Sequence, residues 1–227
     1  MLYFAIIGDF VDSKSIQNRY QAQKILENAL TKINHKYEDI IVSKFSITLG
    51  DEFQGLLTIE APIFHMIDDL CQALFPYEVR FGVGLGNIVT DINPELSIGA
   101  DGPAYWHARE AIQFVHQKND YGNTSLAIEV GNPTKTAQLN ALISAGDAIK
   151  ADWRASQQEV LTSLLEMNVY QEHFDQQALG EMLQLNASAL SKRLKSSSIK
   201  VYLRLRQATL ELILENVMEE KNDGIVS

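Results

Sequence analysis

Two short acidic motifs in the first quarter of the chain could bind a metal ion. The segment IIGDFVDS carries Asp9 and Asp12, and the segment LGDEFQG carries Asp51 and Glu52. Two carboxylates at one point repel each other unless a cation neutralises them, and Mg²⁺ prefers one or two carboxylates together with polyphosphate oxygens. Paired ions there would activate an attacking oxygen and stabilise a leaving pyrophosphate. Spacing alone leaves another interpretation open, in which Gly50 and Asp51 form a turn and Asp9 ends a strand.

A second set of residues could bind DNA. Six Lys or Arg residues and no Asp or Glu lie between Leu183 and Leu210. The apolar spacing predicts a helix-turn-helix, in which Asn186 caps the second helix. The outward face of that helix carries Ser188, Ser191, Lys192, Arg193 and Lys195. The alternative is a helical bundle with a solvated basic face.

The elements that must position the acidic motifs form a mixed α+β pattern. Residues 2–8, 39–49, 53–58, 78–90 and 124–130 are predicted strands, and residues 13–37, 61–75 and 102–117 are predicted helices. This order indicates the split βαβ arrangement of a ferredoxin-like antiparallel sheet. We expect the first strand and the first strand of the hairpin to be neighbours at the centre, so that Asp9 and Asp51 converge.

Alternating glycines mark the strand that follows the hairpin. Gly82, Gly84 and Gly86 have the spacing G-x-G-x-G, and no helix follows directly, so they do not form a dinucleotide-binding loop. Their missing side chains lie on one face of the strand, where a helix or a ligand could approach closely.

No strand pattern appears after Pro133, which predicts an all-α second domain. Residues 134–149, 155–169, 176–184, 187–196 and 199–219 are predicted helices. We place the boundary near residue 150, giving domains 1–150 and 151–227. The last of these helices is amphipathic and could be the seam of a homodimer, which reading a palindromic DNA site would require.

Composition narrows the class of protein further. A net charge of −10 argues against sequence-independent coating of nucleic acid by the whole molecule. Cys71 is the single cysteine, which excludes an intramolecular disulfide and a cysteine-rich zinc site. The apolar N-terminal run is too short to span a membrane and lacks the form of a signal peptide. We therefore expect a cytoplasmic protein.

Four motifs recur in a known order: DFVDS, LGDEFQG, VRFGVGLGNI and IGADGPAYWHAR. Together they resemble the class III nucleotidyl cyclase superfamily and its GGDEF relatives. The whole chain resembles the SatD family, bacterial proteins that join such a domain to a helix-turn-helix. The resemblance implies that Asp9, Asp51 and the carbonyl of Phe10 bind Mg²⁺ or Mn²⁺, and that Arg109 stabilises charge on the transferring phosphates. It also implies a set of nucleotide-binding residues: Asp12, Ser13, Gly50, Glu52 and Asp101.

Two positions depart from the cyclase pattern. Tyr105 replaces the asparagine four residues before Arg109, and Ile47 replaces the polar residue that selects the base. Ribose orientation and base choice are therefore expected to be lost or remade, which argues against ordinary cyclic AMP or cyclic GMP synthesis. His107 is expected to be structural, and Tyr105 and Trp106 to be core residues.

Two functions from different classes remain. The first is a DNA-associated regulator whose α+β domain senses a nucleotide, such as a nucleoside triphosphate, with Mg²⁺; the altered Tyr105 and Ile47 and the helix-turn-helix favour it. The second is a Mg²⁺-dependent nucleotidyl cyclase or transferase with a helical control module, which the retained Asp9, Asp51 and Arg109 favour. The first is our preferred hypothesis.

Overall fold

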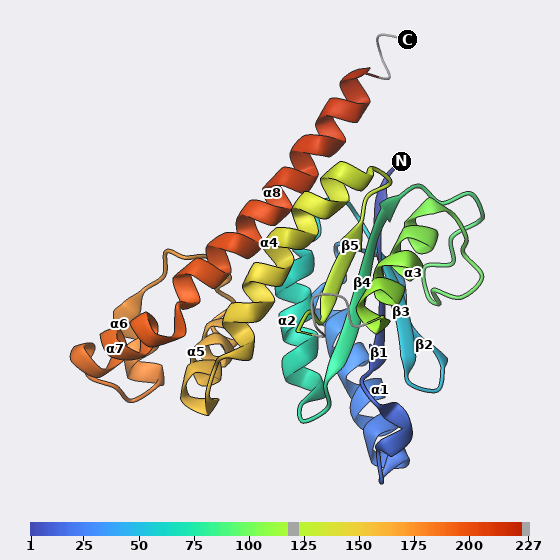
Figure 1. The fold of residues 1–227 in the computed structure, drawn as a ribbon. Helices are drawn as coiled ribbons and strands as arrows, with labels where there is room; N and C mark the ends of the chain where they lie inside the picture. Colours follow the sequence, from blue (N-terminus) through green and yellow to red (C-terminus); the bar gives the residue numbers. More distant parts are fainter. Residues whose placement is uncertain (118–122, 224–227) are drawn as a thin grey trace. The chain divides into compact units, whose positions relative to one another are not determined.

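A computed structural model of the chain describes residues 1–117 and 123–223. The chain divides into two units, Met1–Asn140 and Ala141–Ser227 (Figure 1). The division falls inside helix α4 (Pro133–Ala151), whereas the sequence indicates a boundary near residue 150.

A five-stranded sheet is the centre of the first unit, and its strand order is β2-β3-β1-β4-β5. The strands are β1 (Tyr3–Phe10), β2 (Ile41–Leu49), β3 (Glu52–Leu57), β4 (Val79–Gly86) and β5 (Leu126–Glu129). Neighbours among the first four strands are antiparallel, and β5 runs parallel to β4. The mixed α+β class and the predicted order of elements are therefore present in the first unit. The prediction of an antiparallel sheet holds for β2, β3, β1 and β4 and is wrong for β5, which pairs in parallel with β4.

The hairpin is placed differently from the prediction. The second hairpin strand, β3, pairs with β1, and the first strand, β2, lies at the edge of the sheet. The physical reason is the crossover connection between β1 and β2, which leaves a gap one strand wide between these two strands. The chain folds back after β2, and β3 fills this gap antiparallel to both β1 and β2. The hairpin turn still lies near the end of β1, because Gly8 pairs with Phe53 and the turn at Gly50 and Asp51 precedes β3 directly.

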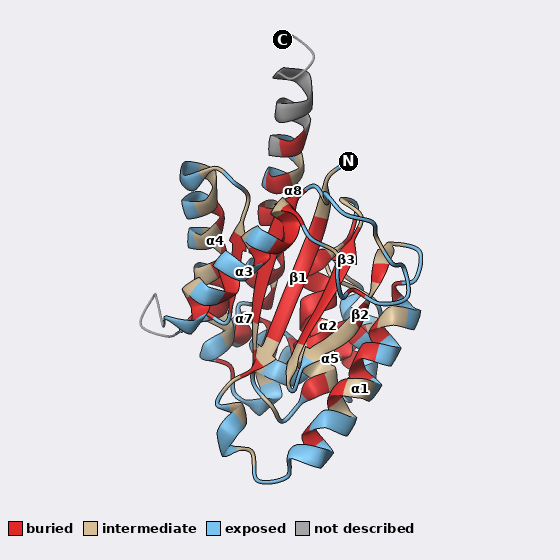
Figure 2. Ribbon diagram, turned by 90° about the vertical axis from the view of Figure 1, so that its right-hand side faces the viewer, coloured by how far each residue is buried: buried red, intermediate tan, exposed pale blue. Residues whose placement is uncertain are grey.

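Helices cover both faces of this sheet. The helical segments are the 3₁₀ turn η1 (Ser13–Ser15), α1 (Arg19–Lys36), α2 (Ile63–Leu74) and α3 (Pro103–His116). Figure 1 shows α1 and α2 on one side of the sheet and α3 on the other. Since β1 is covered on both faces, its residues form a continuous buried apolar run rather than an alternating one (Figure 2).

The glycine series on β4 lets the backbone of α3 lie directly on the strand. A Cβ atom built on Gly84 would lie 2.1 Å from the carbonyl oxygen of Ala104 and 2.2 Å from the amide nitrogen of Ala108. The sequence left open whether a helix or a ligand lies against this face of the strand, and the structure shows that it is a helix. Gly86 meets the first turn of α3 and Gly82 meets Ile112, so α3 runs antiparallel to β4 and ends where β1 ends.

Helices are the regular elements of the second unit in the part of the chain that the structure describes. After α4 come α5 (Ala155–Glu166), α6 (Gln176–Met182), α7 (Ala187–Ser197) and α8 (Ile199–Asp223). Their core includes Trp153, Val160, Leu164, Leu179, Leu190, Tyr202 and Leu203. The indole nitrogen of Trp153 donates to the carbonyl of Ser197 at 2.6 Å, which joins the start of α5 to the end of α7. Among the described helices, none combines the length and apolarity needed to cross a membrane.

We predict that Gly84→Ala lowers the free energy of unfolding of the first unit by about 3 kcal/mol, because the added methyl group must push the α3 backbone away from β4. Chemical denaturation followed by circular dichroism measures the change. Gly99→Ala is the comparison, since Gly99 has open space around it but a positive φ of 91°, so it reports the cost of backbone strain without steric overlap. Equal stability of Gly84→Ala and the wild type would contradict the close packing.

Candidate functional site

Asp9 lies near the end of β1, directly opposite Arg80 on β4. The Nε of Arg80 donates to Oδ1 of Asp9 at 3.1 Å, and a terminal nitrogen of the same guanidinium donates to the carbonyl of Phe10 at 3.3 Å. The Asp9 side chain is 15% exposed and that of Arg80 is 19% exposed. This ion pair is therefore partly shielded from solvent, unlike most ion pairs on protein surfaces.

His116, in the last turn of α3, contacts the other oxygen of the same carboxylate. Its Nε2 lies 2.7 Å from Oδ2 of Asp9. Burial raises the pKa of the Asp9 carboxyl, and the charges of Arg80 and His116 act in the opposite direction. Asp9 thus has partners on both carboxylate oxygens, and they come from two different elements.

The predicted Mg²⁺ can be tested against these contacts. Two of its three predicted ligands, the Asp9 carboxylate and the Phe10 carbonyl, already accept hydrogen bonds from Arg80. Within residues 1–117 and 123–223, no three His, Cys, Asp or Glu side chains are grouped so as to hold a metal ion. In this arrangement the side chains do not fit a resident divalent cation.

Sequence reasoning missed both partners of Asp9. Arg80 is the one charged residue in the strand VRFGVGLG, which is an available signal. Its meaning depends on the register between β1 and β4, however, and that register requires the structure. His116 lies at the end of a helix, and nothing in the sequence indicates that this helix ends beside Asp9.

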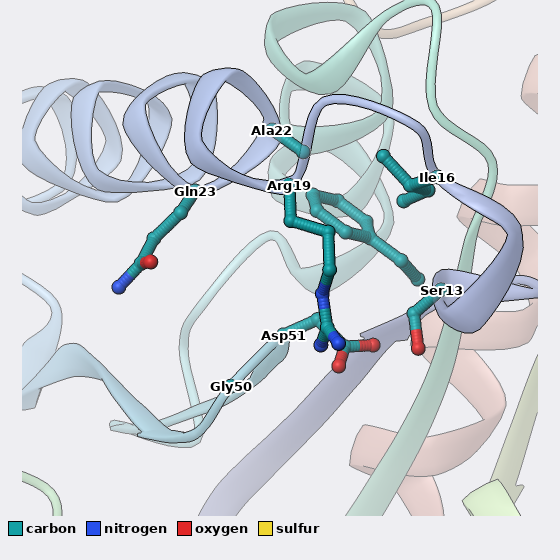
Figure 3. Close-up of a pocket in the computed structure, with 8 residues that line it drawn as sticks. Ser13, Ile16, Arg19, Ala22, Gln23, Gly50 and Asp51 are labelled. Atoms are coloured by element: carbon teal, nitrogen blue, oxygen red, sulfur yellow. The ribbon is translucent and has the colours of Figure 1, made fainter.

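Asp51 belongs to a small cavity on the α1 side of the sheet (Figure 3). The cavity measures about 60 Å³ and is lined by Phe10, Ser13, Ile16, Arg19, Ala22, Gln23, Gly50 and Asp51. Figure 3 shows the side chain of Arg19 extending toward Asp51, with the hydroxyl of Ser13 directed at the same space. Gly50 has a φ of 67°, which the tight turn before Asp51 requires.

These groups could bind an anion. The guanidinium of Arg19, at the first position of α1, and the hydroxyl of Ser13 are donors suited to a phosphate oxygen. The cavity is far smaller than the roughly 300–1,000 Å³ of sites that enclose a small molecule. A nucleotide could therefore place a phosphate group here, with the remainder outside.

Other residues predicted to bind a nucleotide have local partners. Glu52 accepts a hydrogen bond from the hydroxyl of Thr48 at 2.8 Å. Asp12 adopts a left-handed conformation with φ 49° immediately before η1, next to the cavity residue Ser13. Asp101 accepts a hydrogen bond from the indole of Trp106 at 2.7 Å.

The structure does not bring Asp101 or Arg109 to this end of the sheet. Asp101 precedes α3, whose first turn lies beside Gly86, and Gly86 pairs with Tyr3 at the opposite end of β1 from Asp9. Arg109 is exposed and lies two helical turns before His116, about 10 Å along the axis of α3. Among the described residues, none forms an ion pair or hydrogen bond with Arg109.

Tyr105, where the chain departs from the cyclase pattern, lies in the first turns of α3 together with Trp106 and His107. Tyr105 is buried, and burial raises the pKa of its hydroxyl to about 12. Nδ1 of His107 lies 2.7 Å from the carbonyl oxygen of Leu85, which agrees with the expected structural role. Trp106 is 51% exposed, so its prediction as a core residue was wrong, because the helix turns it away from the sheet.

In the second unit, α7 has one buried side and one exposed polar side. Asn186 caps the helix by accepting a hydrogen bond from the amide of Ala189 at 2.9 Å. Leu190 and Leu194 are buried in the core. The exposed side carries Ser188, Ser191, Lys192 and Lys195.

The positive charge near α7 is smaller than the sequence suggests, because three arginines are paired with carboxylates. Arg193 donates to Glu159 at 2.9 Å, and Arg204 donates to both carboxylate oxygens of Glu172. Arg206 forms a buried ion pair with Asp147. Lys192 and Lys195 are the basic residues that remain exposed on α7.

Comparison with known proteins places this chain in a family. A family model described as the SatD family matches residues 3–213 of the chain. No curated protein matches it. A solved structure of a bacterial light-regulated adenylyl cyclase is similar at 14% identity and a TM-score of 0.39, over 55% of this chain and 73% of that chain. A second such structure is similar at 12% identity and a TM-score of 0.37, over 56% of this chain and 42% of that one.

We predict a coupling energy of about 1–3 kcal/mol between Asp9 and Arg80, because the loss of either partner leaves the other partly buried without its counter-charge. A double-mutant cycle of Asp9→Asn and Arg80→Gln, followed by urea denaturation, measures it. The exposed pair Lys24–Glu27 is the control and should show a clearly smaller coupling. Additive effects of Asp9→Asn and Arg80→Gln would show that the ion pair contributes nothing to the fold.

Proposed function

Because the chain belongs to the SatD family, in which the sequence motifs imply a cyclase-like domain joined to a helix-turn-helix, we propose that it is a regulatory protein. Its first unit binds a nucleotide and its second unit binds DNA. The exposed polar side of α7 is the observation that carries this proposal.

The DNA-binding part of the proposal is supported by the two sides of α7. Apolar residues fix the helix in the core, so the opposite side is presented on a rigid support. That side offers the hydroxyls of Ser188 and Ser191 and the ammonium groups of Lys192 and Lys195, which suit phosphate contacts and one or two base edges. Arg193 would have to leave Glu159 before it could contact a base.

A palindromic DNA site requires two copies of α7. The proposed homodimer seam is α8, on which Val201 is 44% exposed and Leu212 is 41% exposed. Contacts between helices of two subunits are usually formed by apolar side chains spaced along one face of each helix.

The nucleotide-binding part of the proposal rests on the cavity beside Asp51. Arg19 and Ser13 supply donors for a phosphate, and Asp51 supplies an acceptor for a ligand hydroxyl. The opening of α1 adds unpaired amide groups near the same place, which also favour negative charge.

Enzymatic turnover is a second candidate function. It is favoured by Phe10 and Asp51, which line one cavity near the end of β1, and by Asp9, which directly precedes Phe10 in the strand. Incubation with each of the four nucleoside triphosphates and Mg²⁺ or Mn²⁺, followed by pyrophosphate detection, distinguishes it from binding alone. Pyrophosphate release that Asp51→Asn abolishes would establish the enzyme.

We predict that Arg19→Gln removes the thermal stabilisation given by a nucleoside triphosphate. Ligand at about a hundred times its Kd adds roughly 2.7 kcal/mol to the wild type. Lys24→Gln is the matched control, since Lys24 lies on the same helix and pairs with Glu27 outside the cavity. Equal stabilisation of the wild type and Arg19→Gln in thermal melts would move the nucleotide away from this cavity.

We predict that replacing both Lys192 and Lys195 by Gln weakens DNA binding and reduces its salt dependence. Each lost phosphate contact changes the slope of log affinity against log salt by about 0.9, so a loss of about one to two units is expected per copy of α7. Fluorescence anisotropy with sequences selected from a random pool, at several salt concentrations, gives the slope.

Arg204→Gln is the matched control for this experiment. Arg204 lies in the same basic segment, but Glu172 already neutralises it, so its loss should leave the salt slope unchanged. If the folded protein enriches no sequence from the pool, α6 and α7 do not form a DNA-binding module and the regulatory proposal fails.

A further inference from the structure

We propose that the guanidinium of Arg80 takes the place of a divalent cation at the end of β1, so that this site works without a resident metal ion. The proposal concerns the metal alone. It goes beyond nucleotide binding and does not depend on it, because metal binding can be measured without a nucleotide.

Arg80 contacts the groups that a metal ion would be expected to bind. The Asp9 carboxylate and the Phe10 carbonyl are the two adjacent oxygen donors that the motif DFVDS implies for a metal ion. One guanidinium donates to both, at 3.1 Å and 3.3 Å. A single cationic group thus occupies both positions.

Arg80 is held in this place by the sheet itself. Arg80 and Asp9 are direct partners in the antiparallel register of β1 and β4, so their side chains lie on the same face. A guanidinium is always charged in proteins, and its rigid fork matches oxygen acceptors well. The positive charge at this site is therefore permanent.

Exchanging Arg80 for a metal carries a cost. A cation at Asp9 would compete with Arg80 and His116 for the two carboxylate oxygens. Arg80 is 19% exposed, and without Asp9 its charge would be left largely shielded from water and unpaired. Both effects act against metal binding in the wild-type protein.

The other predicted metal ligand is in a similar situation. Asp51 lies in the cavity on the α1 side, where the side chain of Arg19 extends toward it (Figure 3). Each of the two aspartates expected to share a cation thus has its own arginine nearby, on different sides of β1.

Titration of the full-length chain with Mn²⁺, followed by electron paramagnetic resonance, tests the proposal. The wild type should show no Mn²⁺ binding that depends on Asp9, so Asp9→Asn should leave its titration unchanged. Arg80→Gln takes away the internal cation, and its affinity for Mn²⁺ should rise at least about tenfold above the wild type. The double variant Arg80→Gln with Asp9→Asn should lose this gain, and Arg80→Lys, which keeps the positive charge but lacks the fork, should gain less affinity than Arg80→Gln.

Two results would overturn the proposal. One is stoichiometric Mn²⁺ binding by the wild type that Asp9→Asn abolishes, since a metal would then bind despite Arg80. The other is folded Arg80→Gln protein, verified by circular dichroism, with no gain in Mn²⁺ affinity. If Arg80→Gln does not fold, the wild-type titration decides the question, because stoichiometric Mn²⁺ binding that depends on Asp9 contradicts the proposal.

Discussion

The contact between the backbones of α3 and β4 determines the geometry of the first unit on that face of the sheet. Three alternating glycines make this contact possible, because any Cβ atom at these positions would overlap the helix backbone. The helix is then fixed in both distance and direction, and its last turn lies at the end of β1. That is how His116 comes within 2.7 Å of Asp9. Packing and site are therefore consequences of the same glycines.

Asp9 shows how such a position restricts chemistry. A carboxylate that is mostly withdrawn from water is costly unless it has partners, and burial does raise its pKa. Arg80 and His116 offset that cost from two elements that the packing already holds in place. The presence of an aspartate at the end of β1 can thus be explained by its ion pairs with Arg80 and His116, as well as by its resemblance to a metal ligand. The motif by itself does not distinguish the two roles.

The sequence predicted the α+β class of the first unit, the order of its elements and the helical character of the second unit, because these follow from apolar periodicity and from glycine and proline positions. It placed β2 instead of β3 beside β1, since neither strand's residues carry a signal for neighbours in the sheet. It also missed Arg80 and His116, which meet Asp9 only through the register of β1 with β4 and the packing of α3. The pairing of Arg193 with Glu159 was hidden for the same reason, as the two residues are 34 positions apart.

These hidden pairings change the electrostatic argument for the second unit. A count of charges between Leu183 and Leu210 gives six positive residues, but carboxylates from outside that segment neutralise its three arginines. Two exposed lysines on α7 would give a salt slope of only about −2 per copy, which is small for a DNA-binding protein. A single copy would thus bind DNA weakly, and the net charge of −10 would weaken it further. Two copies on one DNA site would double the number of phosphate contacts. A dimer is therefore needed for sufficient DNA affinity as well as for matching a palindromic site.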